Sequence, residues 1–115
     1  MTEIDYMKDY QDFLIYKVLY LNMKDFTDYL VSLHKKFVSI NDAGIARTPG
    51  YFAYDNGVKL DAFIKSGRNT SNFLQGIVWP GYAYYTDFYN PAALKFWKDN
   101  LRHNFFPFLM EYELI

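Results

Sequence analysis

The apolar positions that follow Asn22 repeat with the period of an amphipathic helix. They are separated by four, three and four residues, which places them along one helix face: Phe26, Leu30, Leu33 and Phe37. Asn22 precedes Asp25 by three residues, a variant of the capping box that satisfies free amides at a helix start. The pattern therefore predicts a helix that begins just after Asn22.

The pair Asn90-Pro91 predicts the start of a second helix. Asn is a favoured N-cap residue, and proline is favoured at the first helical position because its missing N–H has no helical partner there. Behind this pair, Leu94, Trp97 and Leu101 form one apolar stripe. We predict a helix that ends near His103 and turns this stripe inward.

The remaining apolar runs are short. The runs 4–7 and 37–40 predict strands, so Phe37 belongs either to the helix or to the second strand. Residues 42–81 hold all six glycines and two of the four prolines and predict a long irregular connection. Loops of this length in compact domains are usually functional. The order strand, helix, strand, long loop, helix predicts an α/β protein with a βαβ unit followed by its second crossover.

Composition narrows the classes of function. Hydrophobic residues make up 51% of the 115 residues, so the chain is globular, and its size is that of one small domain or a piece of a larger one. Twelve basic and thirteen acidic residues give a net charge of −1, which disfavours nucleic acid or an anionic membrane as a partner.

The sequence also disfavours disulfides, membrane spans and metal sites. The chain has no cysteine, which removes disulfides and thiolate sites, and no apolar run approaches the ~18 residues of a membrane span. No signal peptide is recognisable at the N-terminus. His34 and His103 lie on predicted helices without a third ligand nearby. We expect no metal and no cofactor.

Trp79 is the strongest candidate for a binding residue. It precedes Pro80 and Gly81, a pair that fixes φ and then permits a positive φ, so the chain is expected to reverse and present the indole outward. A flat aromatic face with a polar edge suits a sugar ring, which has an apolar C–H face and a hydroxylated rim. Aromatic residues reach 22% of the chain, although most of them are expected to pack in the core.

Residues 76–97 resemble glycoside hydrolase family 31, the α-glucosidase family. The resemblance rests on Val78-Trp79-Pro80-Gly81, on 86–91 (Thr-Asp-Phe-Tyr-Asn-Pro) and on Phe96-Trp97, in the family's order and without gaps. It continues upstream through 3–7 (Glu-Ile-Asp-Tyr-Met), Asp12-Phe13, Leu33-His34, 37–45, 54–57 (Tyr-Asp-Asn-Gly) and 63–65 (Phe-Ile-Lys).

The resemblance implies a partial (β/α)8 TIM barrel, from about its second strand to just before its fourth. Residues 1–115 would then be one partial catalytic domain of a retaining α-glucosidase-like hydrolase. It also implies three substrate-binding residues: Trp79 in the glucose pocket, Ile45 as an apolar wall, and Glu3, which stands where the family has an Asp that hydrogen-bonds sugar hydroxyls. Asp42, at the rim, and Asp87, in a turn, are expected to be structural.

Catalytic residues are not expected in this chain. Retaining glycosidases use two carboxyl groups about 5 Å apart. Continued without gaps, the resemblance places the nucleophile position on Leu114, which has no reactive group, and the acid/base would come later still. Glu113 is adjacent, but neighbouring residues of a strand point to opposite faces. We therefore expect no hydrolysis by this chain alone.

Two other interpretations stay open, a non-catalytic carbohydrate-binding remnant and an inactive product of a gene model or pseudogene. The expected partners are an α-linked oligosaccharide or glycan and the remainder of a barrel, whose absence would leave strand edges uncovered. Members of the family work in lysosomes, in the endoplasmic reticulum or outside the cell, so the sequence assigns no compartment and no particular linkage.

Overall fold

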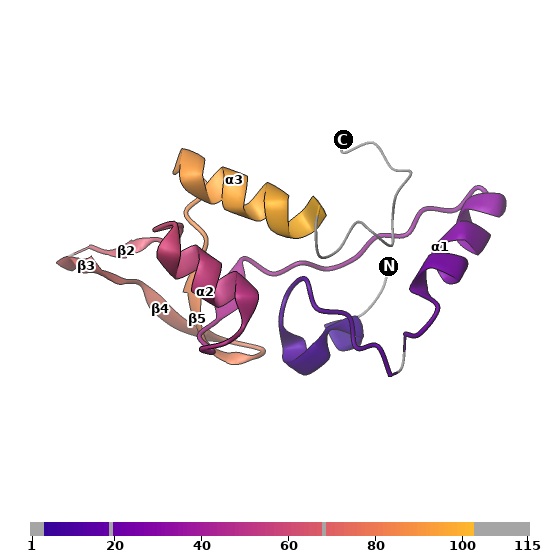
Figure 1. Ribbon diagram of the computed structural model, residues 1–115, viewed down its shortest axis with the longest axis horizontal. Coiled ribbons are helices and arrows are strands. Elements are labelled where there is room, and N and C mark those ends of the chain that lie inside the picture. The colour runs from indigo at the N-terminus through magenta and orange to yellow at the C-terminus, as the bar shows by residue number, and fades with distance from the viewer. Residues whose placement is uncertain (1–3, 19, 68, 103–115) are drawn as a thin grey trace.

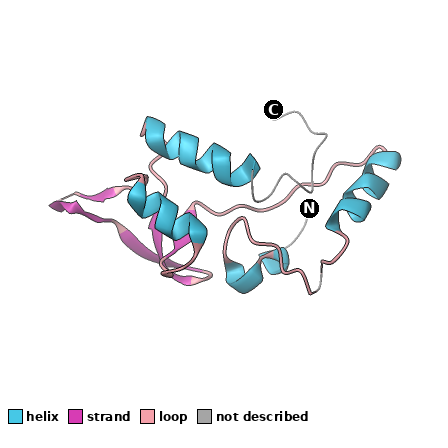
Figure 2. Ribbon diagram, in the orientation of Figure 1, coloured by secondary structure: helices cyan, strands magenta, loops and turns pink. Residues whose placement is uncertain are grey.

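The structure is a computed structural model that describes residues 4–18, 20–67 and 69–102 (Figure 1). Within these residues, two short 3₁₀ turns come first, and three helices and five strands follow them; Figure 2 shows their arrangement. The bounds are η1 Ile4–Tyr6, η2 Lys8–Tyr10, α1 Met23–Ser32, β1 Gly44–Ala46, α2 Phe52–Lys59, β2 Lys65–Ser66, β3 Asn69–Phe73, β4 Gln75–Val78, β5 Gly81–Tyr85 and α3 Pro91–Asn100. Within the described ranges, no helix is long and apolar enough to cross a membrane.

The strands form two antiparallel sheets. The larger has the order β1-β5-β4, and the smaller pairs β2 with β3. In the larger sheet Ile45 lies opposite Tyr84, and Val78 lies opposite Gly81 across a turn of two residues. A turn this short can only join antiparallel neighbours. The described strand pairs are thus antiparallel, and the predicted parallel βαβ unit is wrong because its two runs, 4–7 and 37–40, form no strand of this structure.

The predicted irregular connection over 42–81 is also wrong, because this stretch contains β1, α2, β2, β3 and β4. The glycines of this stretch suggested a loop, but two of them lie in regular elements. There the missing side chain leaves room for a large aromatic ring. A Cβ on Gly57, in α2, would overlap the Phe63 ring, and one on Gly76, in β4, would overlap the Tyr85 hydroxyl. These glycines mark close packing rather than loops.

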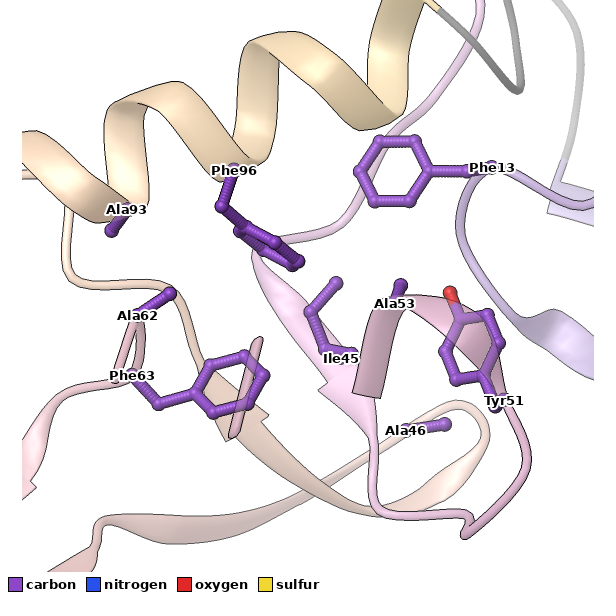
Figure 3. Close-up of a cluster of buried hydrophobic side chains, with 9 residues drawn as sticks. All are labelled: Phe13, Ile45, Ala46, Tyr51, Ala53, Ala62, Phe63, Ala93 and Phe96. Carbon is purple, nitrogen blue, oxygen red and sulfur yellow. The ribbon is translucent and has the colours of Figure 1, made fainter. Parts of the chain in front are cut away.

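The main core lies where α2 and α3 meet the larger sheet (Figure 3). Phe63 is at its centre, with ring centroids 5.4 Å from Phe73, 5.6 Å from Tyr84 and 6.0 Å from Phe96. The other buried members are Phe13, Ile45, Ala46, Tyr51, Ala53, Ala62 and Ala93. Phe13 comes from the N-terminal segment, so the core ties the start of the chain to the sheet.

The N-terminal third departs from the predicted strands. Residues 4–6 form η1 rather than a strand, and Met7 only makes an isolated bridge with Ile15. Residues 37–40 belong to no strand of the described structure. The run 4–7 is too short for its apolar content to separate a strand from a turn.

Helix α1 begins where predicted, but its other features differ. The Asn22 side chain makes no cap hydrogen bond, and the helix ends at Ser32, before the last two residues of the predicted stripe. Met23 and Thr27 are its buried residues, whereas Phe26 is 46% exposed. The predicted apolar stripe is thus not the buried face in this structure.

Helix α3 confirms the predicted start and corrects the predicted face. The Asn90 side chain accepts a hydrogen bond from the Ala92 amide at 2.9 Å. The buried residues are Ala93, Phe96 and Asn100, while Leu94 is 42% exposed, so the buried face is shifted from the predicted one. Ala93 is a small buried residue of this helix, which is in contact with α2. Trp97 and Leu101, the two other residues of the predicted stripe, are only partly buried.

Candidate functional site

Trp79 occupies the first corner of the turn between β4 and β5, followed by Pro80. Gly81 has φ +97°, a conformation that side-chain-bearing residues rarely adopt. The Trp79 side chain is 70% exposed. The structure therefore places the predicted turn and the outward indole as the sequence indicated.

An open hollow of about 470 Å³ lies beside this turn. Its described lining residues are Asp42, Ile77, Val78 and Trp79. Asp42 comes from the segment before β1, so the hollow brings together two parts of the chain that are far apart in sequence. It offers an aromatic face, two aliphatic side chains and a carboxylate, which is the mixture that suits a sugar.

Asp42 is held in place by a buried carboxylate that sequence reasoning left without a role. Asp12 is 1% exposed, and its side-chain oxygen accepts a hydrogen bond from the Asp42 backbone amide at 2.7 Å. The Tyr51 hydroxyl in turn donates to the Asp12 backbone carbonyl. Three segments of the chain are thus joined beneath the rim of the hollow.

Burial changes the acidity of these groups. Desolvation raises the pKa of the Asp12 carboxyl to about 7, although the hydrogen bond from Asp42 acts in the opposite direction. Burial, reinforced by the nearby Asp12 charge, also raises the pKa of the Tyr6 and Tyr51 hydroxyls well above the usual value. Asp12 has the pKa of a general acid or base, but its burial keeps it from a substrate.

The other predicted site residues are not gathered around Trp79. Ile45 is 0% exposed and packs in the main core, so it does not line the hollow in this structure (Figure 3). Glu3 lies outside the described residues, as do Glu113 and Leu114. Asp87 ties its own turn, as expected, by accepting a hydrogen bond from the Tyr89 amide at 3.2 Å.

A second hollow, of about 730 Å³, was not predicted from the sequence. It lies on the N-terminal segment and is lined by Asp5, Met7, Lys8, Asp9, Tyr10, Tyr16 and Tyr20. The spacing of its tyrosines, six and four residues apart, is the only signal in the sequence, and it matches no regular element. In the part of the chain that the structure describes, no group of three or more side chains could hold a metal ion.

Known proteins are similar to this chain in sequence and in fold. Residues 1–114 match the model of the glycosyl hydrolases family 31 TIM-barrel domain. A probable α-glucosidase of Oryza sativa subsp. japonica is 44% identical over 98 residues, which are 84% of this chain and 11% of that protein. An α-glucosidase of Schizosaccharomyces pombe is 40% identical over 109 residues, covering 87% of this chain and 11% of that protein.

A solved structure agrees with the sequence comparison. The crystal structure of an ER glucosidase II complex, of catalytic subunit and the binding domain of a regulatory subunit, matches with a TM-score of 0.85 and 27% identity. The match covers 95% of this chain and 12% of the matched chain. The chain therefore spans little more than a tenth of the length of these proteins. It belongs to glycoside hydrolase family 31, and its residues correspond to part of the TIM-barrel domain of that family.

Proposed function

We propose that this chain supplies substrate-binding surface to a retaining α-glucosidase-like hydrolase, and that the catalytic carboxylates lie outside residues 1–115. The substrate is an α-linked oligosaccharide or glycan, as the names of the relatives suggest. Within the barrel, the chain corresponds to the region from about the second strand to just before the fourth. The remainder of the barrel is its expected structural partner.

The exposed indole of Trp79 is the observation that carries this proposal. A large side chain that is 70% exposed at a rigid turn, beside the Asp42 carboxylate, is positioned to contact a ligand rather than to fill a core. Stacking of the sugar on the indole would bury its apolar face, while the carboxylate accepts hydrogen bonds from hydroxyl groups. Glu3 is a secondary member of the proposed surface, whereas Ile45, which is 0% exposed, supports it from the core. Ile45 would contribute by fixing β1 from within the core.

Two of the described carboxylates, those of Asp12 and Asp87, are already engaged within the fold. Asp12 is enclosed, and Asp87 is engaged in its own turn. Hydrolysis with retention needs a nucleophile and an acid/base on opposite sides of one sugar ring. We expect no turnover of an aryl α-glucoside above the rate in buffer. Turnover that is abolished by Glu113→Gln would refute the assignment of position 114 as the nucleophile position.

Saturation-transfer difference NMR with maltose tests the binding surface. We expect saturable binding, on the order of millimolar because few contacts remain after the entropy cost of association. Trp79→Ala should remove it. Tyr89→Ala is the matched control because this aromatic side chain is 100% exposed and is not among the described residues that line the hollow. Equal binding by the Trp79 variant and the native chain would refute the proposal.

A further inference from the structure

The second hollow combines flat aromatic side chains with hydrogen-bonding groups. Tyr10 is 41% exposed and Tyr16 is 38% exposed, so both rings are partly open to solvent. Tyr20 is half-buried and packs against the small cluster formed by Tyr6 and Met7. At about 730 Å³ the hollow is within the usual range for ligand sites, about 300–1,000 Å³.

Tyr10 connects this hollow to the turn of β4 and β5. Its ring centroid lies 6.2 Å from that of Trp79, with the two planes inclined by 39°. Tyr10 lines the second hollow and Trp79 lines the first, so the contact between the two rings joins the two hollows. Figure 1 shows the β4–β5 turn directed toward the N-terminal segment, in agreement with this contact.

The backbone around Tyr10 is held in an unusual conformation. Asp9 and Tyr10 have φ of 54° and 56°, in the left-handed region that residues with side chains seldom occupy. Such conformations persist where the surrounding structure enforces them, and they concentrate at ligand-binding segments. Here the Leu14 carbonyl accepts a hydrogen bond from the Lys8 amide at 3.0 Å, which closes the loop that presents Tyr10.

The charges of the hollow select the class of ligand. Asp5 and Asp9 supply two carboxylates against the single ammonium of Lys8, so an anionic ligand would be repelled. A metal ion is not favoured either, because no group of three potential ligands exists among the described residues. Aromatic faces ringed by carboxylates, an ammonium and phenol hydroxyls fit a neutral, polyhydroxylated molecule with apolar faces, which is a carbohydrate.

We propose that the hollow lined by Tyr10, Tyr16 and Tyr20 is a second carbohydrate-binding surface, which holds the further units of an α-glucan whose first unit lies on Trp79. This inference rests on the proposed function, and it adds that the preferred ligand is a chain of several sugars rather than a disaccharide. The sugar chain passes over Tyr10, which lines the second hollow and whose ring contacts that of Trp79 in the first.

Tyr16 is the residue on which to test this proposal. Tyr16 lines the second hollow and not the first. Its backbone amide donates a hydrogen bond to the Tyr6 carbonyl at 2.8 Å, and this bond does not depend on the side chain. Tyr16→Leu removes the flat ring and keeps an apolar side chain, so the fold is retained. Tyr16→Phe keeps the ring, and Tyr89→Ala serves as a control for loss of an exposed tyrosine.

The experiment compares dissociation constants for maltose and maltohexaose by NMR titration of the full chain. We expect the native chain to bind maltohexaose more tightly than maltose. Tyr16→Leu should weaken maltohexaose binding about tenfold, the ratio expected for loss of one aromatic contact, and leave maltose binding unchanged. Tyr16→Phe and Tyr89→Ala should behave like the native chain, with amide spectra confirming that every variant is folded.

The inference is overturned by equal affinity of the native chain for both sugars, or by unchanged maltohexaose binding in Tyr16→Leu. Failure of the proposed function looks different, because maltose binding would then be absent or insensitive to Trp79→Ala. Loss of maltose binding in Tyr16→Leu would also count against the inference, since it would show that Tyr16 does not act on the longer ligand alone.

Discussion

Replacing Asp12 with Asn should stabilise this protein at high pH and have little effect at low pH. In the folded chain the Asp12 carboxyl is 1% exposed and receives a hydrogen bond from the Asp42 amide at 2.7 Å. The amide oxygen of Asn can accept the same hydrogen bond, so the contact survives the substitution. What the substitution removes is the ionisation of a buried carboxyl group.

The magnitude follows from the raised pKa. Burial raises the pKa of Asp12 from 3.8 to about 7. Each pKa unit corresponds to about 1.4 kcal/mol, so ionisation of the folded protein costs about 4 kcal/mol more than ionisation of the unfolded chain. The unfolded chain loses this proton near pH 4, whereas the folded chain retains it until about pH 7. Stability therefore decreases as the pH rises through this window, and the full cost applies above it.

Urea unfolding of the native chain and of Asp12→Asn at pH 4.5, 6 and 8 measures the effect. The variant should be about as stable as the native chain near pH 4 and more stable by up to about 4 kcal/mol at pH 8. Contributions from other titrating groups cancel in the difference. Asp28→Asn is the control, because this exposed partner of Lys24 should contribute less than about 1 kcal/mol at any pH.

The reasoning would be refuted by a stability difference that does not change with pH. A variant that is less stable than the native chain at pH 8 would also refute it. Either result would mean that the Asp12 carboxylate is ionised in the folded protein at little cost, and that its charge supports the position of Asp42 directly.

The remaining predictions concern packing and capping. Gly57→Ala should destabilise the fold by about 1–2 kcal/mol, because overlap of the new methyl group with the buried Phe63 ring outweighs the gain of about 1 kcal/mol in helix propensity. Gly67→Ala has open space at the new Cβ and should leave the melting temperature almost unchanged, so equal effects of the two substitutions would contradict the packing argument. Asn90→Ala should cost about 1 kcal/mol through loss of the bond from the Ala92 amide, measurable by urea unfolding, and Asn90→Ser should restore most of it.

The sequence predicted those helix starts and turns that depend on only a few neighbouring residues. The start of α3 follows from Asn90-Pro91, and the exposed corner of the β4–β5 turn follows from the order of Trp79, Pro80 and Gly81. The start of α1 was predicted at the right place, although the Asn22 side chain makes no cap hydrogen bond. Each of these signals acts through the backbone of its own segment. The family resemblance, which rests chiefly on residues 76–97, is confirmed by the comparisons.

Features that depend on contacts between distant segments were not predictable in the same way. The glycine at 57 suggested a loop, although it lies in α2 because the Phe63 ring occupies the place of its side chain. The roles of Asp12 and Tyr10 come from partners 30 and 69 residues away in the chain, the Asp42 amide and the Trp79 ring. The pattern of residues within either segment does not predict these distant partners.

The central claim, that the Trp79 turn is a sugar-binding surface, has a direct test in the indole N–H signals of the chain. Two tryptophans give two such signals, and Trp79→Phe identifies them. Trp97 is partly buried, with ring centroids 5.1 Å from both Phe13 and Phe88, and it is the internal control. Addition of maltose to the ¹⁵N-labelled chain should shift the Trp79 signal in a saturable manner and leave the Trp97 signal in place. A Trp79 signal that stays fixed at saturating maltose, or two signals that shift together, would contradict the account.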